Sequence, residues 1–358
     1  MPGKVLNMPG KDLNMPGKDL KIVFFGTPEF AVESLGAIVD AGYNVAAVVT
    51  MPDKPAGRGH HLFESPVKRY AVEHNIPVLQ PVKLKDPQFL DELRSIGADL
   101  FIVIAFRMLP EAVWQMPPLG TFNLHASLLP RYRGAAPINW AVINGDTCTG
   151  VTTFFLKHEI DTGDVIAQEK VDILPTDNAG DVHDRLMLLG RDLVLDTIRR
   201  IIDGNLRTVP QEQLLTAGEE PTPAPKIFKD TCRIDWNRPA LQVHNLVRGL
   251  SPYPCAWTEL YPSPASQTSD QELHSADSDA GGKADAAPLL NLKVISTRVI
   301  DGIPCAAPGA VSTDGRLAIQ CGDGKAVEIL RLQPSGKKAM DAADYLRGAR
   351  LPESLLAR

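Results

Sequence analysis

The sequence predicts an α/β domain with a mostly parallel sheet and helices on both faces, followed by a small C-terminal β-barrel. Up to about residue 203, short apolar runs alternate with helix-like segments, which is typical of parallel strands joined by helices. Beyond residue 225, short strand-like runs are separated by glycine-bearing turns, which is typical of a barrel. The chain has 358 residues, which is long for one core, so two domains are expected.

Apolar runs and the segments between them predict the elements of the first domain, residues 21–205. The expected strands lie at residues 21–26, 45–50, 77–79, 99–105, 121–124 and 151–156. The expected helices lie at residues 28–41, 67–74, 87–96 and 177–203. Because strands and helices alternate, we expect a Rossmann-like sheet whose ligand lies beyond the carboxyl ends of the strands.

Composition divides the rest of the chain. Residues 1–20 repeat a seven-residue unit whose Pro-Gly pair breaks helices, so we expect a flexible tail; a binding tail is the alternative. Residues 206–225 are rich in Pro, Thr, Gln and Glu, as a linker would be. Residues 226–358 are expected to form the OB-like barrel, with strands at 255–261, 292–299, 317–321 and 326–333. Within it, residues 262–288 carry five acidic residues and one lysine among Ser, Ala and Gly, which predicts a disordered insertion.

Bulk properties exclude several classes of protein. No apolar run approaches the roughly 20 residues that a membrane helix needs. Five cysteines without a C-x-x-C pair favour reduced thiols in a cytoplasmic protein over a disulfide framework or a zinc site. The net charge of −6 argues against a chain coated in nucleic acid. A local RNA-binding site remains compatible with this net charge, because the C-terminal domain outside the insertion has a small excess of basic residues.

The candidate catalytic residues lie at the ends of expected strands. The first strand is followed by Gly-Thr-Pro-Glu, which is neither G-x-G-x-x-G nor a P-loop, so no dinucleotide or ATP site is indicated. Asn123 and His125 lie two apart at a strand end, so their side chains share a face. Asp161, in Asp-Thr-Gly-Asp after another strand, can orient His125. Together these groups suit acyl transfer to an amine, in which the amide stabilises the oxyanion and the imidazole moves protons. Taken singly, a His at a strand end is more often structural, and an Asp in Asp-Thr-Gly-Asp is more often a turn residue.

Their sequence context carries a resemblance. The run N-L-H-A-S-L-L-P-R-Y-R-G-A-A-P, then T-G-V-T and D-T-G-D, resembles the formyltransferase family that uses 10-formyltetrahydrofolate. The resemblance implies Asn123, His125 and Asp161 as the catalytic set, 10-formyltetrahydrofolate as co-substrate, and no metal. It implies a folate pocket lined by Ile104, Phe106, Met108, Leu109, Ser127, Leu128, Leu129 and Pro130. Relatives usually show Ala-Tyr-Gly-x-x-Leu-Pro beside this pocket, whereas residues 105–110 here read A-F-R-M-L-P and are one residue shorter.

Two further segments, residues 26–30 and 52–59, resemble the branch of this family that acts on initiator methionyl-tRNA. The match runs from about residue 21 to the C-terminus, apart from the insertion. It implies folate and initiator methionyl-tRNA as partners, with no membrane and no protein partner. The implied tRNA-binding residues are Lys54, Arg58, His60, Lys337 and Lys338. Two alternatives are a sugar-amine formyltransferase, which would not need the loop around Arg58, and a catalytically inactive RNA-binding protein, which would not need the Asn-His-Asp set.

Overall fold

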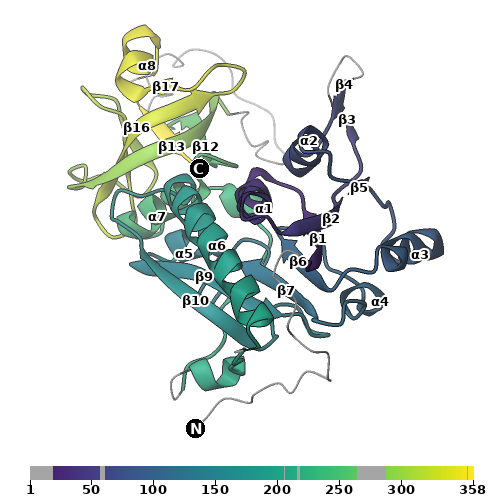
Figure 1. Cartoon of the computed structure of the whole chain (residues 1–358). Helices are drawn as coiled ribbons and strands as arrows, with labels where there is room; N and C mark the ends of the chain where they lie inside the picture. Colours follow the sequence, from purple (N-terminus) through teal and green to yellow (C-terminus); the bar gives the residue numbers. More distant parts are fainter. Residues whose placement is uncertain (1–18, 57–60, 205, 216–217, 264–287, 353) are drawn as a thin grey trace, which may run out of the picture. The chain divides into compact units, whose positions relative to one another are not determined.

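The computed structural model describes residues 19–56, 61–204, 206–215, 218–263, 288–352 and 354–358 (Figure 1). Contacts divide the chain into two compact units. The first comprises Met1–Ile138, Cys148–Asp172 and Val182–Lys226, and the second comprises Asn139–Thr147, Ile173–Asp181 and Ile227–Arg358. Residues 1–18 of the expected tail and 264–287 of the expected insertion lie outside the described residues.

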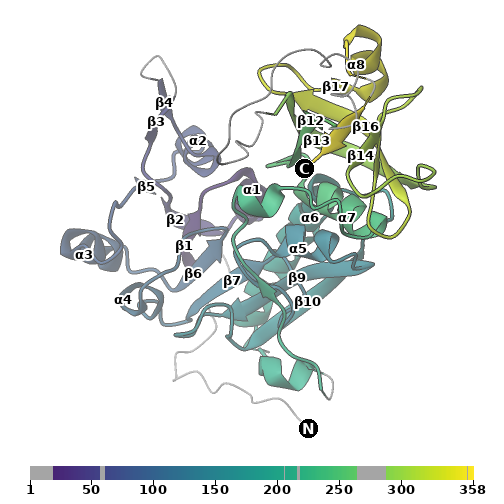
Figure 2. The same ribbon diagram turned by 180° about the vertical axis from the view of Figure 1, so that it is seen from behind.

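A seven-stranded sheet of order β10-β9-β7-β6-β1-β2-β5 forms the centre of the first unit (Figures 1 and 2). Its strands are β1 (Lys21–Gly26), β2 (Asn44–Val49), β5 (Val78–Leu79), β6 (Leu100–Ile104), β7 (Thr121–His125), β9 (Cys148–Phe155) and β10 (Val165–Asp172). The first five are parallel, whereas β9 is antiparallel to both β7 and β10. The mostly parallel sheet is thus confirmed. Its strand order reverses between β1 and β6, which is where ligands bind in such sheets.

Helices cover both faces of this sheet. They are α1 (Glu29–Asp40), α2 (Pro66–Glu73), α3 (Pro87–Ser95), α4 (Glu111–Trp114) and α6 (Ala179–Ile202). On one face, α3 and α4 bury apolar side chains against Phe101 and Val103 of β6. On the other, α6 approaches β7 closely, since a Cβ on Gly190 would lie 2.7 Å from Leu124 Cδ2. Side chains alternate along a strand, so Asn123, opposite Val103 in the register, points to the face of α3 and α4.

Residues 206–225, which composition led us to expect as a linker, pack on the first unit. Leu206, Thr208 and Gln211 are buried, and Val209 exchanges backbone hydrogen bonds with Val165. The segment contains a 3₁₀ helix, η1 (Gln211–Leu214), and strand β11 (Pro223–Ala224), which pairs with β8 (Arg133–Gly134). A hairpin of β3 (Lys54–Ala56) and β4 (His61–Phe63) completes the unit. The polar composition of residues 206–225 did not predict this packing. Polar side chains can be buried when they are hydrogen-bonded, so a polar segment is not necessarily exposed.

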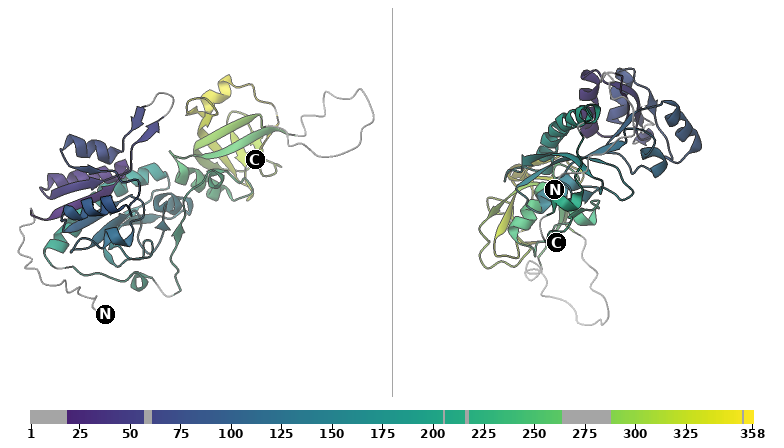
Figure 3. Two further views of the ribbon diagram at one scale, coloured as in Figure 1. Left: turned by 90° about the vertical axis from the view of Figure 1, so that its right-hand side faces the viewer. Right: turned by 60° about the horizontal axis from the view of Figure 1, so that its bottom comes forward.

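The second unit contains a closed antiparallel barrel, whose green-to-yellow strands curve round one another in Figure 3. Its strands are β12 (Ala256–Pro262), β13 (Leu290–Ile300), β14 (Ala310–Ser312), β15 (Ala318–Gln320), β16 (Ala326–Pro334), β17 (Met340–Asp341) and β18 (Leu355–Ala357). The order β13-β12-β18-β14-β15-β16 closes through pairing of β13 with β16, which confirms the expected barrel. The unit's helices are α5 (Pro137–Ile143, in part), α7 (Ala240–Leu250), α8 (Ala342–Gly348) and the 3₁₀ helix η2 (Asp230–Cys232).

The barrel core is apolar, and α7 buries Val243 and Val247 in it beside Val294 and Ile329. Within the described ranges, no helix has both the length and the apolarity needed to cross a membrane. All five cysteines are free thiols.

Candidate active site

His125, at the carboxyl end of β7, is held by a backbone carbonyl. Its Nε2 lies 2.8 Å from the carbonyl oxygen of Tyr132. A carbonyl only accepts hydrogen bonds, so Nε2 carries the proton, and in the neutral ring Nδ1 is the basic nitrogen. Nδ1 lies 3.8 Å from Asp161 Oδ2, which is too long for a hydrogen bond but close enough for strong charge interaction. The carbonyl of Tyr132 therefore fixes the imidazole, whereas we had expected Asp161 to do so, and Asp161 supplies a nearby negative charge.

Asn123 shares a sheet face with His125, as expected from their spacing along β7. Asn123 is half-buried, whereas His125 is 7% exposed. Among the described residues, the Asn123 amide makes no side-chain hydrogen bond. The structure therefore brings the expected amide, imidazole and carboxylate to one region of the first unit.

The carboxylate is held by groups that the sequence did not indicate. Asp161 lies in the loop between β9 and β10, and its Oδ2 accepts a hydrogen bond of 2.9 Å from the Gly134 backbone N–H. The fully buried Gln211 donates from Nε2 to the carbonyl oxygens of Asp161 and Gly163, at 2.9 and 2.8 Å. Its Oε1 accepts from Nε and Nη2 of Arg133, at 3.0 and 2.7 Å. Gln211 is 50 residues away in a polar stretch, so no local pattern connects it to the site.

Two glycines in these motifs are required by close backbone approach. A Cβ on Gly163, in Asp-Thr-Gly-Asp, would lie 1.6 Å from the carbonyl oxygen of Phe155. Gly134 has φ of 125°, and a Cβ there would lie 2.6 Å from the carbonyl oxygen of Ala224. The two loops that meet at Asp161 therefore tolerate no side chain at these positions without moving.

The loop after His125 is tied to the sheet by a hydrogen-bond network. Ser127 is fully buried, and its Oγ donates to the carbonyl oxygen of Arg131 at 2.6 Å. The hydroxyl of Thr152, on β9, donates to the carbonyl oxygen of Ser127 at 2.6 Å. The same hydroxyl lies 3.1 Å from the Leu129 N–H, which donates to it. This loop is consequently a rigid wall beside His125.

The expected folate-binding residues differ in accessibility. Ile104, Leu109, Ser127, Leu129 and Pro130 are buried. Phe106 is half-buried against Phe25 with ring centroids 5.8 Å apart, Leu128 is also half-buried, and Met108 is 71% exposed. In this conformation a ligand can therefore reach Phe106, Met108 and Leu128 most readily.

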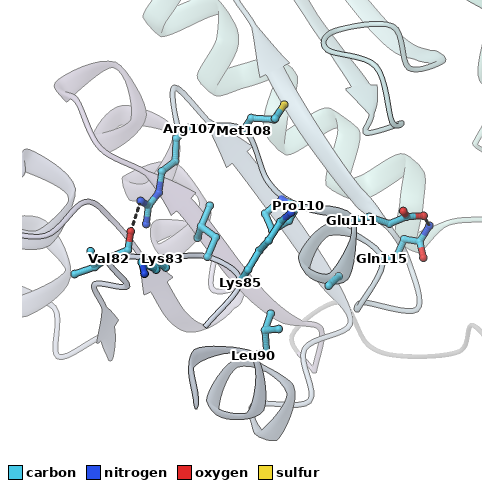
Figure 4. Close-up of a pocket in the computed structure, with 11 residues that line it drawn as sticks. Val82, Lys83, Lys85, Leu90, Arg107, Met108, Pro110, Glu111 and Gln115 are labelled. Atoms are coloured by element: carbon cyan, nitrogen blue, oxygen red, sulfur yellow. Dashed lines mark hydrogen bonds between the residues drawn. The ribbon is translucent and has the colours of Figure 1, made fainter. Parts of the chain in front are cut away.

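A cavity of about 830 Å³ adjoins this segment (Figure 4). Its walls come from the loop between β5 and α3, from α3 itself, and from the segment that runs from β6 into and past α4. The lining residues are Val82, Lys83, Leu84, Lys85, Leu90, Arg107, Met108, Pro110, Glu111, Ala112 and Gln115. Such a volume is large enough for a substantial organic ligand.

The expected tRNA-binding residues lie in both units. In the first unit, Lys54 is exposed on β3, and Arg58 and His60 lie outside the described residues. In the second, Lys337 and Lys338 are exposed in the turn between β16 and β17. Throughout the described part of the chain, no group of three or more His, Cys, Asp or Glu side chains is arranged to hold a metal ion.

Comparison with known proteins identifies the family of the chain. Residues 20–198 match the family model described as "Formyl transferase", and residues 226–350 match "Formyl transferase, C-terminal domain". Methionyl-tRNA formyltransferase from Bacteroides fragilis is 53% identical over 93% of this chain and 96% of that protein. The enzyme from Porphyromonas gingivalis (strain W83) is 47% identical over 94% and 97%.

Among solved structures, a sugar 3N-formyl transferase (WlaRD), in the presence of dTDP and 5-N-formyl-THF, is similar with a TM-score of 0.58. It is 20% identical and covers 89% of this chain and 99% of that one. At that identity the likeness concerns the fold alone. The family models and the curated relatives, in contrast, cover nearly the whole sequence. The chain therefore belongs to the formyl transferase family, among the methionyl-tRNA formyltransferases.

Proposed function

We propose that Asn123, His125 and Asp161 transfer the formyl group of 10-formyltetrahydrofolate to the free amino group of methionine on initiator tRNA. The observation that carries this proposal is the convergence of these side chains, with His125 Nδ1 3.8 Å from Asp161 Oδ2. The product is the formylated aminoacyl-tRNA used in translation initiation.

The reaction begins with attack of the methionine nitrogen on the formyl carbon. The carbonyl oxygen of the formyl group then becomes an oxyanion in a tetrahedral intermediate. The Asn123 amide is a neutral donor that can hydrogen-bond to this oxyanion without changing its own protonation. Donors of this kind are preorganised, so they stabilise the developing charge without reorganising during the reaction.

A proton must also move from the attacking amine to N10 of the departing folate. His125 suits this role because its Nε2–H is engaged by Tyr132, which leaves Nδ1 to accept a proton. An imidazolium formed in this way faces the carboxylate of Asp161. Asp161 is itself fixed by Gly134 and Gln211, so the negative charge stays where the imidazolium forms.

Binding is assigned to surfaces of both units. Folate lies against Phe106, Met108 and Leu128, with Ile104, Leu109, Ser127, Leu129 and Pro130 forming the packed layer behind them. Initiator methionyl-tRNA is held by Lys54, Arg58 and His60 in the first unit and by Lys337 and Lys338 in the barrel. We propose no protein partner for this chemistry, and a cytoplasmic location, because charged initiator tRNA is used in translation.

The decisive experiment offers purified protein and 10-formyltetrahydrofolate to three acceptors in parallel. These are initiator methionyl-tRNA, elongator methionyl-tRNA and a nucleotide-linked amino sugar. We expect rapid formylation of the initiator tRNA and little of the other two. Preference for the amino sugar would establish the sugar-amine alternative, and tRNA binding without transfer would establish the inactive RNA-binding alternative.

A further inference from the structure

The β3–β4 hairpin lies beside helix α2, and Lys68 of that helix joins its two ends (Figures 1 and 2). Asp53 immediately precedes β3, and Glu64 immediately follows β4. Lys68 Nζ lies 2.5 Å from Asp53 Oδ2 and 2.7 Å from Glu64 Oε1. One ammonium group therefore donates to a carboxylate at each end of the hairpin and closes its base from outside.

Three further hydrogen bonds fix the same base to the sheet. Gln80, directly after β5, donates from Nε2 to Asp53 Oδ1 at 2.8 Å and to the carbonyl oxygen of Met51 at 2.9 Å. The buried hydroxyls of Thr50 and Ser65 are hydrogen-bonded at 2.8 Å and join the end of β2 to the start of α2. Both carboxylate oxygens of Asp53 thus accept hydrogen bonds, which fixes the orientation of this residue as well as its position.

The ammonium of Lys68 is used within the protein. The side chain of Lys68 is 16% exposed, and that of Asp53 is 19% exposed. Their hydrogen bond lowers the pKa of Asp53 and raises the pKa of Lys68, so both groups stay charged at neutral pH. A phosphate group would have to displace a carboxylate to reach this ammonium. Lys68 is therefore placed to orient the hairpin and not to bind RNA itself.

The hairpin carries residues to which we assign tRNA binding. Lys54 follows Asp53 directly and is exposed on β3. Arg58 and His60 lie between the two strands in the sequence. A pair of three-residue strands is at most marginally stable by itself, so the direction of the hairpin depends on the contacts at its base. Contacts that fix Asp53 consequently fix its neighbour Lys54.

We propose that Lys68 is a positioning residue for the acceptor substrate: by holding Asp53 and Glu64 together, it orients the β3–β4 hairpin for initiator methionyl-tRNA. This inference rests on the proposed function, because it concerns how the same tRNA-binding surface is held. Without the two ion pairs the hairpin samples several directions, and only a fraction of molecules can bind tRNA. The apparent affinity falls by that fraction, whereas tRNA that is bound reacts normally.

The test measures kcat, KM for charged initiator tRNA and KM for 10-formyltetrahydrofolate in variants of the whole chain. Lys68→Gln should raise KM for tRNA about tenfold, as for a competent fraction of about one tenth, and leave kcat and KM for folate unchanged. Lys68→Arg should restore KM for tRNA, because a guanidinium can donate to both carboxylates. The matched control Arg69→Gln removes the same charge from the next, exposed residue of α2 and should change KM for tRNA by less than about twofold.

A second variant separates orientation from charge. Asp53→Asn removes a negative charge beside the hairpin, so repulsion of phosphates alone predicts a lower KM for tRNA. The same change removes the ion pair with Lys68, so loss of orientation predicts a KM for tRNA that is higher by about threefold or more. Its control, Glu73→Gln, removes an exposed carboxylate from the same helix and should not raise KM for tRNA.

A KM for tRNA that does not rise in Asp53→Asn would overturn the inference. Equal KM values for tRNA in Lys68→Gln and Arg69→Gln would do the same, because the contacts with the two carboxylates would then be irrelevant. So would a Lys68→Arg variant as impaired as Lys68→Gln. Failure of the proposed function looks different: the unaltered protein itself would not formylate charged initiator tRNA.

Discussion

Replacing Gln211 with leucine tests whether the support of Asp161 matters for catalysis. Gln211 is fully buried and makes four hydrogen bonds, two to the carbonyls of Asp161 and Gly163 and two from Arg133. Leucine has a similar size but can make none of them. Two carbonyls and a guanidinium then lose their partner, at about 1–3 kcal/mol for each group left unsatisfied. The native loop conformation should therefore be destabilised by about 3 kcal/mol or more.

A loop destabilised by this amount should move Asp161 away from His125. A displacement of about 1 Å in a catalytic arrangement can reduce the rate on the order of 100-fold. We expect Gln211→Leu to lower kcat for formyl transfer by about 30- to 100-fold, with faster hydrogen exchange in residues 156–164 and unchanged exchange in the barrel. Gln213→Leu, an exposed position in the same 3₁₀ helix, is the matched control. If Gln211→Leu keeps kcat within threefold of the control, the hydrogen bonds to Asp161 do not position it for catalysis.

Three further predictions address other parts of the structure. Gly163→Ala forces backbone movement beside Phe155 and should lower kcat at least tenfold. The control Gly348→Ala, whose added Cβ meets no atom within 4 Å, should leave kcat unchanged. Equal kcat values for the two variants would refute the clash argument. The double variant Lys337→Gln/Lys338→Gln should raise KM for tRNA several-fold and weaken its dependence on salt, while KM for folate stays unchanged. An unchanged salt dependence of KM for tRNA would exclude phosphate contacts by these two lysines. Burial lowers the pKa of His244 from 6.5 to about 4, so between these pH values the unfolded state binds more protons and the barrel loses stability as pH falls. Since His244 is partly solvated, we expect the free energy of unfolding of the barrel, measured by hydrogen exchange, to fall on the order of 1–2 kcal/mol from pH 7 to pH 4. The decrease should be smaller in His244→Gln. An identical decrease in the two proteins would show that another group is responsible.

Much of the fold was predictable because its signals are local. The apolar runs of β1, β2 and β6 are buried on both sides, which is what continuous hydrophobic sequence indicates. The edge strand β10 was not predicted, because its last five residues, Gln-Glu-Lys-Val-Asp, are mostly polar and none of them is fully buried. Short elements such as β8 and β17 contain two residues each and become strands only through tertiary pairing.

The candidate site likewise combines features that local sequence predicts with features that only tertiary structure shows. The shared face of Asn123 and His125 follows from strand periodicity, so it could be predicted from spacing alone. The contributions of Gln211 and of the Tyr132 carbonyl could not, since one lies in a distant polar segment and the other is a backbone group. The hydrogen bonds from the Arg107 guanidinium to the carbonyl oxygens of Val82 and Pro81 were equally unpredictable, because sequence cannot reveal which carbonyls a guanidinium will reach.

The most direct test of the catalytic assignment is the turnover number of Asn123→Ala in the formylation of initiator methionyl-tRNA. The side chain is half-buried at the face that carries His125, and its loss removes one donor to the oxyanion. We expect kcat to fall on the order of 10²- to 10³-fold while the circular dichroism spectrum and folate binding stay close to those of the unaltered protein. Asn291→Ala, an exposed asparagine on β13, should retain full activity. A kcat for Asn123→Ala within threefold of the unaltered protein would contradict the account, because Asn123 would then lie outside the reacting centre.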